Sequence, residues 1–275
     1  MRTGLAFLTS CLALASSLLP ATAQEIPALR AVPSPHDVAE APESKTIDLQ
    51  WVSDSKNEIT DDEAWWEENQ LDSPFLAVPN PGMNVQGNLP AVMPFTLEDG
   101  RRVVIASEGI GDRPFAIYGK NFAQGDAVLI FDSELTKITD ALDFSSWIQG
   151  HYRIQWVQVV DGTLYFSYGI NGYARDVEGE TGFLVAYDLE TLTLKWKSAP
   201  VVSNSRQFLL IGNTIISGYG FTAEPDFVHL LNRHNGEVVR SIEVASAPQF
   251  LIRKEDELFV RCYNRDYVFR LLDLD

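Results

Sequence analysis

Residues 183–196 read FLVAYDLETLTLKW. The first half is an apolar run that ends at Asp188, which is typical of a strand buried on both faces. Residues 188–191 form a polar turn, and the alternation from Leu192 to Trp196 predicts a second strand. Two strands joined by so short a turn pair antiparallel, so this stretch predicts a hairpin within a larger sheet.

The same succession of segments occurs four times along the chain. In each unit a tight polar turn precedes one strand, and a loop of variable length leads to the next. The strands after the tight turns are expected at 103–107, 164–168, 215–219 and 258–262, and their partners at 127–132, 183–188, 227–232 and 267–273. Apolar stretches come before each pair at 92–97, 154–160, 207–211 and 249–252, and three units continue into 138–144, 192–196 and 238–244.

Four-stranded antiparallel units repeated in this way are typical of propeller blades. A lone sheet of this kind leaves apolar faces in water, and stacking several sheets around an axis buries those faces. We therefore predict an all-β, β-propeller-like fold of four to five four-stranded blades, with a short N-terminal helix and an extended arm. The alternative is a β-sandwich of repeated hairpins.

The N-terminal segment has the order of a secretory signal peptide. Arg2 is followed by an uncharged, mostly apolar stretch at 5–19, and the small residues Ala21 and Ala23 precede Gln24. Residues 1–23 are therefore expected to be cleaved, which places the mature chain in the periplasm or outside the cell. The alternatives are a retained N-terminal anchor and, less favoured, a lipoprotein attached through the cysteine in this stretch.

Two segments separate this leader from the repeats, which occupy residues 91–275. Residues 24–45 are rich in Pro, Ala, Glu and Ser, which favours a flexible linker. Residues 46–90 are expected to form an N-terminal arm that contains a strand, a short helix and a proline-rich loop.

The strand of that arm is expected at 46–52, where apolar and polar residues alternate. The fourth repeat ends at Asp275 without an outer strand, and we expect 46–52 to supply it. The helix is expected to begin at a capping box formed by Thr60 and Glu63.

Composition narrows the classes of partner. One of the 21 basic residues, Arg2, lies in the leader, so the mature chain would carry 20 basic against 38 acidic residues. Such a balance disfavours nucleic acid and anionic membrane surfaces as partners. Of the two cysteines, Cys11 lies in the leader, which leaves Cys262 alone and without an intramolecular disulfide partner.

The segment 186–191, Ala-Tyr-Asp-Leu-Glu-Thr, followed by Lys195-Trp196, resembles the A-x-D-x-x-T-G-x-x-x-W blade end of quinoprotein-like β-propellers, the PQQ-repeat and WD-repeat-like group. Residues 232–238 resemble the same turn with its glycine present. The resemblance covers residues 91–275. It departs from the pattern at Leu192, which replaces the turn glycine, and in having only four clear blades, where such propellers usually have more.

The resemblance implies pyrroloquinoline quinone and calcium as the group's best-known chemistry. That site generally needs calcium ligands and often a vicinal disulfide. A lone cysteine cannot form such a disulfide, and no ligand set carries over by motif. We therefore predict neither a cofactor nor a metal site, with calcium or the quinone as the alternative.

The loops between second and third strands are expected to gather on one face of a propeller, together with the segments that join the blades. The two longest, at 108–126 and 169–182, combine aromatic with charged residues, which suits a peptide or sugar ligand. The candidate ligand-binding residues are Asp112, Arg113, Tyr118, Lys120, Tyr173, Arg175 and Asp176. The alternative is that these loops only cover the central channel.

Other titratable groups have structural explanations. The acidic residues at 61–63 and 67–68 are better explained by a helix than by a catalytic pair, because negative charge is favourable at a helix N-terminus and on a solvated helix face. Trp65 and Trp66 are expected to dock that helix against the propeller. His229 lies within an expected strand and is interpreted as a core residue. Polar residues recur at 132, 188 and 232, which fits side-chain capping of the turns.

No catalytic residue is assigned. The sequence favours an exported, non-enzymatic propeller that binds a protein or a surface glycan through its long-loop face. The alternative is a periplasmic enzyme of the glycosidase or quinoprotein-dehydrogenase type, with its site at the propeller centre.

Overall fold

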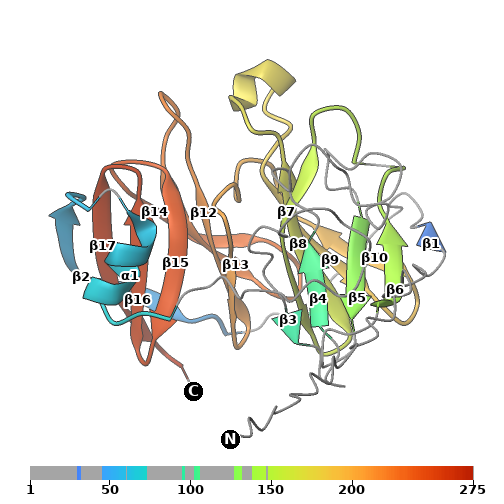
Figure 1. Ribbon diagram of the computed structural model, residues 1–275, viewed down its shortest axis with the longest axis horizontal. Coiled ribbons are helices and arrows are strands. Elements are labelled where there is room, and N and C mark those ends of the chain that lie inside the picture. The colour runs from blue at the N-terminus through green and yellow to red at the C-terminus, as the bar shows by residue number, and fades with distance from the viewer. Residues whose placement is uncertain are drawn as a thin grey trace, which may run out of the picture.

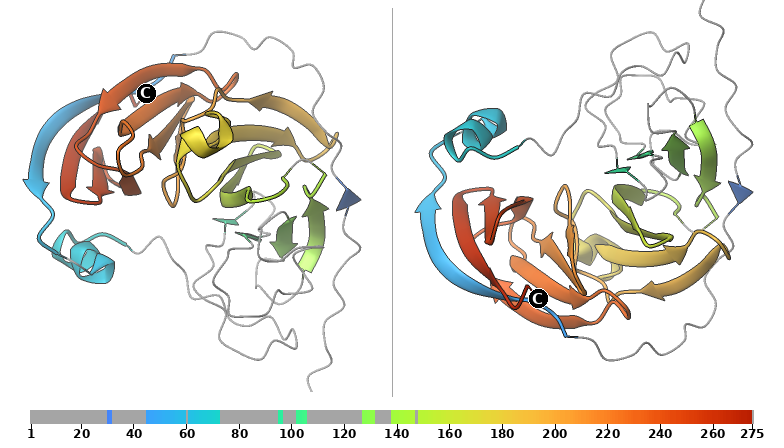
Figure 2. Two further views of the ribbon diagram at one scale, coloured as in Figure 1. Left: turned by 90° about the horizontal axis from the view of Figure 1, so that it is seen from above. Right: turned by 90° about the horizontal axis from the view of Figure 1, so that it is seen from below.

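The computed structural model describes residues 30–31, 45–59, 61–72, 95–96, 102–105, 127–131, 138–146 and 148–274. The described strands form four sheets that succeed one another along an arc, and one short α-helix lies beside the last sheet (Figures 1 and 2). The fold is therefore all-β and propeller-like, with four blades among the described residues. A sandwich would consist of two sheets packed face to face, which these four sheets do not form.

Each blade is a meander in which neighbouring strands pair antiparallel. Blade 1 contains β3 (Phe95–Thr96), β4 (Arg102–Ile105), β5 (Ala127–Phe131) and β6 (Ile138–Asp143). Blade 2 contains β7 (Arg153–Val160), β8 (Thr163–Gly169), β9 (Phe183–Asp188) and β10 (Thr193–Lys197). Blade 3 contains β11 (Leu209–Ile211), β12 (Thr214–Tyr219), β13 (Phe227–Asn232) and β14 (Val238–Glu243).

Blade 4 is completed from the other end of the chain, as the sequence predicted. It contains β15 (Pro248–Lys254), β16 (Glu257–Cys262), β17 (Arg265–Leu272) and, as its outer strand, β2 (Asp48–Lys56). β2 pairs antiparallel with β17, with Leu49 opposite Leu271 and Asp54 opposite Tyr267. The side chains of Arg265 and Asp54 form an ion pair between the two strands, which supports this register.

β1 (Arg30–Ala31) was not predicted. It pairs parallel with β6, opposite Leu142 and Asp143, and makes blade 1 five-stranded. It lies within 24–45, the expected linker, where two residues give no periodicity from which a strand could be recognised.

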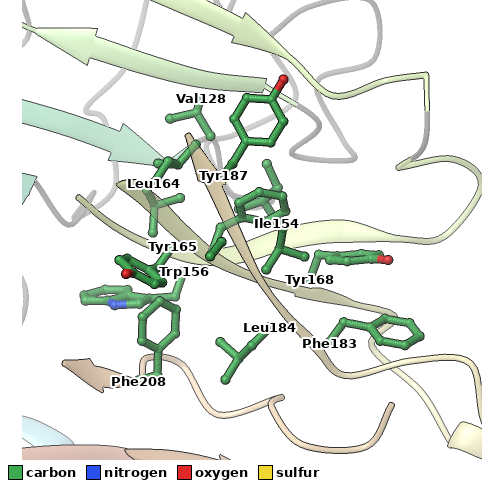
Figure 3. Close-up of a cluster of buried hydrophobic side chains, with 14 of the residues drawn as sticks. Val128, Ile154, Trp156, Leu164, Tyr165, Tyr168, Phe183, Leu184, Tyr187 and Phe208 are labelled. Atoms are coloured by element: carbon green, nitrogen blue, oxygen red, sulfur yellow. The ribbon is translucent and has the colours of Figure 1, made fainter. Parts of the chain in front are cut away.

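Apolar side chains between the sheets hold the blades together. One cluster joins blades 1, 2 and 3: Val128 lies beside Leu164 and Tyr187, and Phe208 lies close to Trp156 (Figure 3). A second cluster joins blade 3 to blade 4 and includes Leu49 of β2. Each fully buried Val, Leu, Ile or Phe side chain stabilises the fold by about 1.5–3 kcal/mol. Because many of them lie between the sheets, blade stacking is the main source of stability.

The turn motif also connects blades 2 and 3. The Trp196 indole donates a hydrogen bond of 2.9 Å to the carbonyl of Arg233, which lies in the corresponding turn of the next blade. Gly236 of that turn has a φ of +74° and lies directly against the Trp196 ring. Leu192 adopts the same left-handed conformation, with a φ of +56°, where the resembling motif has glycine.

Polar residues cap these turns, as predicted. Asp188 accepts hydrogen bonds from the backbone amides of Glu190 and Thr191, and the bond from Thr191 is the main reason why the pKa of Asp188 is lowered. Asn232 accepts from the amide of His234. The corresponding residue at 132 lies outside the described residues.

The helix α1 (Asp62–Glu68) covers the face of blade 4 that points away from blade 3. Trp65 and Trp66 are buried, and the Trp66 ring packs edge-on against Phe250 at 5.5 Å, so both tryptophans dock the helix as predicted. The expected cap at Thr60 was wrong by one residue. Asp61 is the N-cap, and its carboxylate accepts from the amides two and three residues on.

Candidate functional site

The candidate site lies on the face that carries the loops between second and third strands. In blade 2 this loop contains the 3₁₀ helix η2 (Ala174–Val177), which projects beyond the sheets (Figure 1). In blade 3 the corresponding loop spans 220–226. The two loops touch where the ring of Tyr173 meets the ring of Phe221 edge-on, with 4.8 Å between centroids.

The three described candidate residues lie together at this contact. The guanidinium of Arg175 lies 4.3 Å from the centroid of the Tyr173 ring, a cation–π geometry. Its Nε atom is 3.8 Å from a carboxylate oxygen of Asp176. The side chains of Arg175 and Asp176 remain 73% and 59% exposed. We call Tyr173, Arg175, Asp176 and Phe221 the loop-face cluster. It presents an aromatic surface and both signs of charge to solvent.

Glu224 joins the two loops beneath this cluster. One carboxylate oxygen accepts a 2.8 Å hydrogen bond from the amide of Ala174, and the other accepts 2.7 Å from the Tyr219 hydroxyl. Burial, with Glu224 as a further cause, raises the pKa of Tyr219. At neutral pH the tyrosine therefore keeps its proton and donates this hydrogen bond, and the Glu224 carboxylate links η2 to blade 3.

Asp226 is a second carboxyl group in the same loop. Burial, followed by the nearby charge of Glu224, raises the pKa of Asp226 to about 6. Its Oδ1 atom is buried without a hydrogen-bond partner and lies against Gly220, where a larger residue would leave no room. Because its charged form is poorly stabilised, Asp226 is sensitive to pH near neutrality.

Sequence reasoning missed two parts of this arrangement. Phe221 and Glu224 lie in the short loop at 220–226, which was not one of the two long loops that supplied candidates, and their role arises from contacts with the neighbouring blade. No local pattern indicates a carboxylate that bridges two blades. The other four candidates, Asp112, Arg113, Tyr118 and Lys120, lie outside the described residues.

His229 and Cys262, two other residues that could take part in chemistry, are buried. His229 is buried in β13, burial lowers its pKa to about 4, and its Nδ1 atom lies 2.9 Å from the Ser241 hydroxyl. Cys262 is a buried free thiol whose pKa is raised, chiefly by burial. Within the described part of the chain, no three His, Cys, Asp or Glu side chains are placed together to hold a metal ion.

No described helix has the length and apolar character needed to cross a membrane.

No protein-family model matches this chain. No curated protein matches it either. Among solved structures, it is similar to the computationally designed Ika4 protein, with a TM-score of 0.40 and 11% identity over 68% of this chain and 95% of that one. The designed Ika8 protein has a TM-score of 0.42 and 11% identity, over 68% and 48% of the two chains. BamB from Moraxella catarrhalis has a TM-score of 0.34 and 13% identity, over 64% and 56%.

The chain thus spans about half the length of Ika8 and of BamB. All three TM-scores lie below 0.5, so the assignment of the fold rests on the sheets and strand pairing described above.

Proposed function

We propose that this protein is an exported, non-enzymatic β-propeller that binds a protein or surface glycan through its loop face. The observation that supports the proposal most directly is the loop-face cluster. It gathers an exposed cation, an exposed carboxylate and two aromatic rings from two adjacent blades. Aromatic and arginine side chains are the residues that contribute most to binding at protein interfaces.

The position of the loop-face cluster on the fold also supports the proposal. Glu224 ties η2 to blade 3, so the cluster stands on two packed sheets rather than on an isolated loop. A ligand that binds there meets a preorganised surface, and less conformational entropy is lost on binding.

The binding test uses the mature protein from Gln24 as bait against an envelope extract of the source cell. We expect a partner that Tyr173→Ala/Arg175→Ala captures at least about tenfold less well, because an aromatic anchor and a charge are both removed. Arg270→Ala, an exposed arginine on β17, is the matched control and should capture normally. Equal capture by all three proteins, or turnover of a sugar or alcohol by the wild type, would contradict the proposal.

Export is tested separately. We expect the N-terminus of the protein recovered from the periplasm or medium to be Gln24, because small residues occupy the positions one and three residues before it. A cytoplasmic protein that still carries Met1 would overturn this part of the proposal and leave the binding test unaffected.

A further inference from the structure

A cavity of about 240 Å³ lies on blade 4, where β2, α1 and β17 meet, whereas the loop-face cluster lies on blades 2 and 3. Its walls come from the end of β2 at 53–56, from Trp65 and Glu68 of α1, and from the start of β17 at 266–268. The cavity exists only because the N-terminal strand completes blade 4 and the helix folds back over it.

Buried contacts hold these walls in place. The Arg261 side chain is only 4% exposed. Its Nε atom donates 2.7 Å to Asp62, Nη2 donates 2.7 Å to the carbonyl of Ile59, and its guanidinium lies 5.2 Å from the Trp65 ring centroid. A buried charge with this many partners is costly to displace, so α1 is fixed against the sheet and the cavity keeps its shape.

The lining has more negative than positive groups. Glu58 and Glu68 line it, and neither forms an ion pair within the described part of the chain. Asp266 and Asp54 also line it, but each is ion-paired, Asp266 Oδ2 at 3.7 Å from Nη1 of Arg261 and Asp54 with Arg265. The Oδ1 atom of Asp266 is buried without a hydrogen-bond partner. Lys56 is the one basic residue of the lining. The hydroxyls of Ser53 and Ser55 add further hydrogen-bond acceptors.

We propose that this cavity binds a small organic amine in its ammonium form. An ammonium group donates several hydrogen bonds, and the carboxylates and hydroxyls of the lining accept them. The volume is below the range of drug-sized ligand pockets, which limits the ligand to a few heavy atoms. The neighbouring rings of Trp65 and Tyr267 suit the methylene groups of an alkylamine.

Isothermal titration of the mature protein at low ionic strength tests the proposal, with 1,4-diaminobutane as the probe and 1,4-butanediol as its uncharged counterpart. We expect the diamine to bind and the diol to give no heat beyond dilution. Glu68→Gln removes a negative charge that attracts the diamine and should weaken its affinity by about threefold or more. Lys56→Gln removes a positive charge that repels the diamine and should strengthen its affinity by a similar factor.

Glu63→Gln is the matched control, because Glu63 lies on the same helix but does not line the cavity. It should bind the diamine like the wild type, and thermal unfolding should show that all three variants are folded. No binding of the diamine, equal binding of the diol, weaker binding by Lys56→Gln, or an effect of Glu63→Gln as large as that of Glu68→Gln would each overturn the proposal.

Discussion

Gly236 shows at the scale of one residue how the turn motif connects two blades. Its left-handed backbone favours glycine, and a Cβ atom there would overlap the Trp196 ring of the preceding blade. Gly212 also has a positive φ but has open space where a Cβ would lie. Substitution of Gly212 by alanine would therefore cause backbone strain alone, whereas substitution of Gly236 would cause both backbone strain and a clash with Trp196.

We expect Gly212→Ala to lower the free energy of unfolding by about 1 kcal/mol, because alanine strains the left-handed backbone. Gly236→Ala should cost about 1–3 kcal/mol more, because the ring of Trp196 must also move. Urea unfolding of both variants measures this difference. Equal losses would show that Gly236 does not pack against the tryptophan.

Asp226 gives a pH-dependent prediction with a definite sign. Its pKa rises to about 6 on folding, so its protonated form is the one the fold favours. Its stabilising contribution is fully present below the pKa of the unfolded state and is lost as the pH rises through about 6. Replacing it with asparagine removes this dependence.

We therefore expect the stability of Asp226→Asn, measured relative to the wild type, to increase between pH 4 and pH 7. Urea unfolding at several pH values in this range measures the difference. His229 titrates in both proteins, so its own contribution cancels in the comparison. A relative stability that is constant or that falls as the pH rises would contradict the account of Asp226.

At the scale of the element, β2 is buried near its beginning and exposed farther along. Leu49 is 1% exposed and packs between blades 3 and 4, whereas Trp51 in the same strand is 59% exposed. Leu49→Ala should lower the free energy of unfolding by about 2–5 kcal/mol, because it leaves a cavity in the core. Trp51→Ala should cost no more than about 1 kcal/mol. Equal losses in thermal unfolding would show that Leu49 is not packed in the core between blades 3 and 4.

The sequence predicted the strands best where periodicity and turn chemistry agree. Both β9 and β13 have the bounds expected from their apolar runs, and β2 joins the sheet for which it was expected. The prediction failed for β1, because two residues carry no pattern, and at the N-cap, because Thr60 and Asp61 are both good capping residues and local sequence does not choose between them.

At the scale of the whole molecule, the sequence predicted the face that carries the candidate site but not how the site is assembled. Tyr173, Arg175 and Asp176 share one long loop, so the composition of that loop was enough to select them as candidates. Phe221 and Glu224 contribute through contacts with a loop of another blade. Such contacts depend on how the blades stack, and a pattern read along one chain segment carries no information about them.

The arrangement of the molecule depends on residues 48–56 forming the outer strand of blade 4, since that strand also builds the cavity. Gln50 and Arg270 face each other in the register of β2 and β17, and both are exposed. The variant Gln50→Cys/Arg270→Cys should therefore form a disulfide on mild oxidation of the folded protein, while buried Cys262 stays reduced.

Peptide mapping by mass spectrometry of this variant is the decisive measurement, with Gln50→Cys/Leu272→Cys as the control two residues out of register. We predict a high yield of the 50–270 disulfide and little of the 50–272 disulfide. Absence of the first disulfide, or equal yields of the two, would contradict a propeller whose last blade is completed by the N-terminal strand.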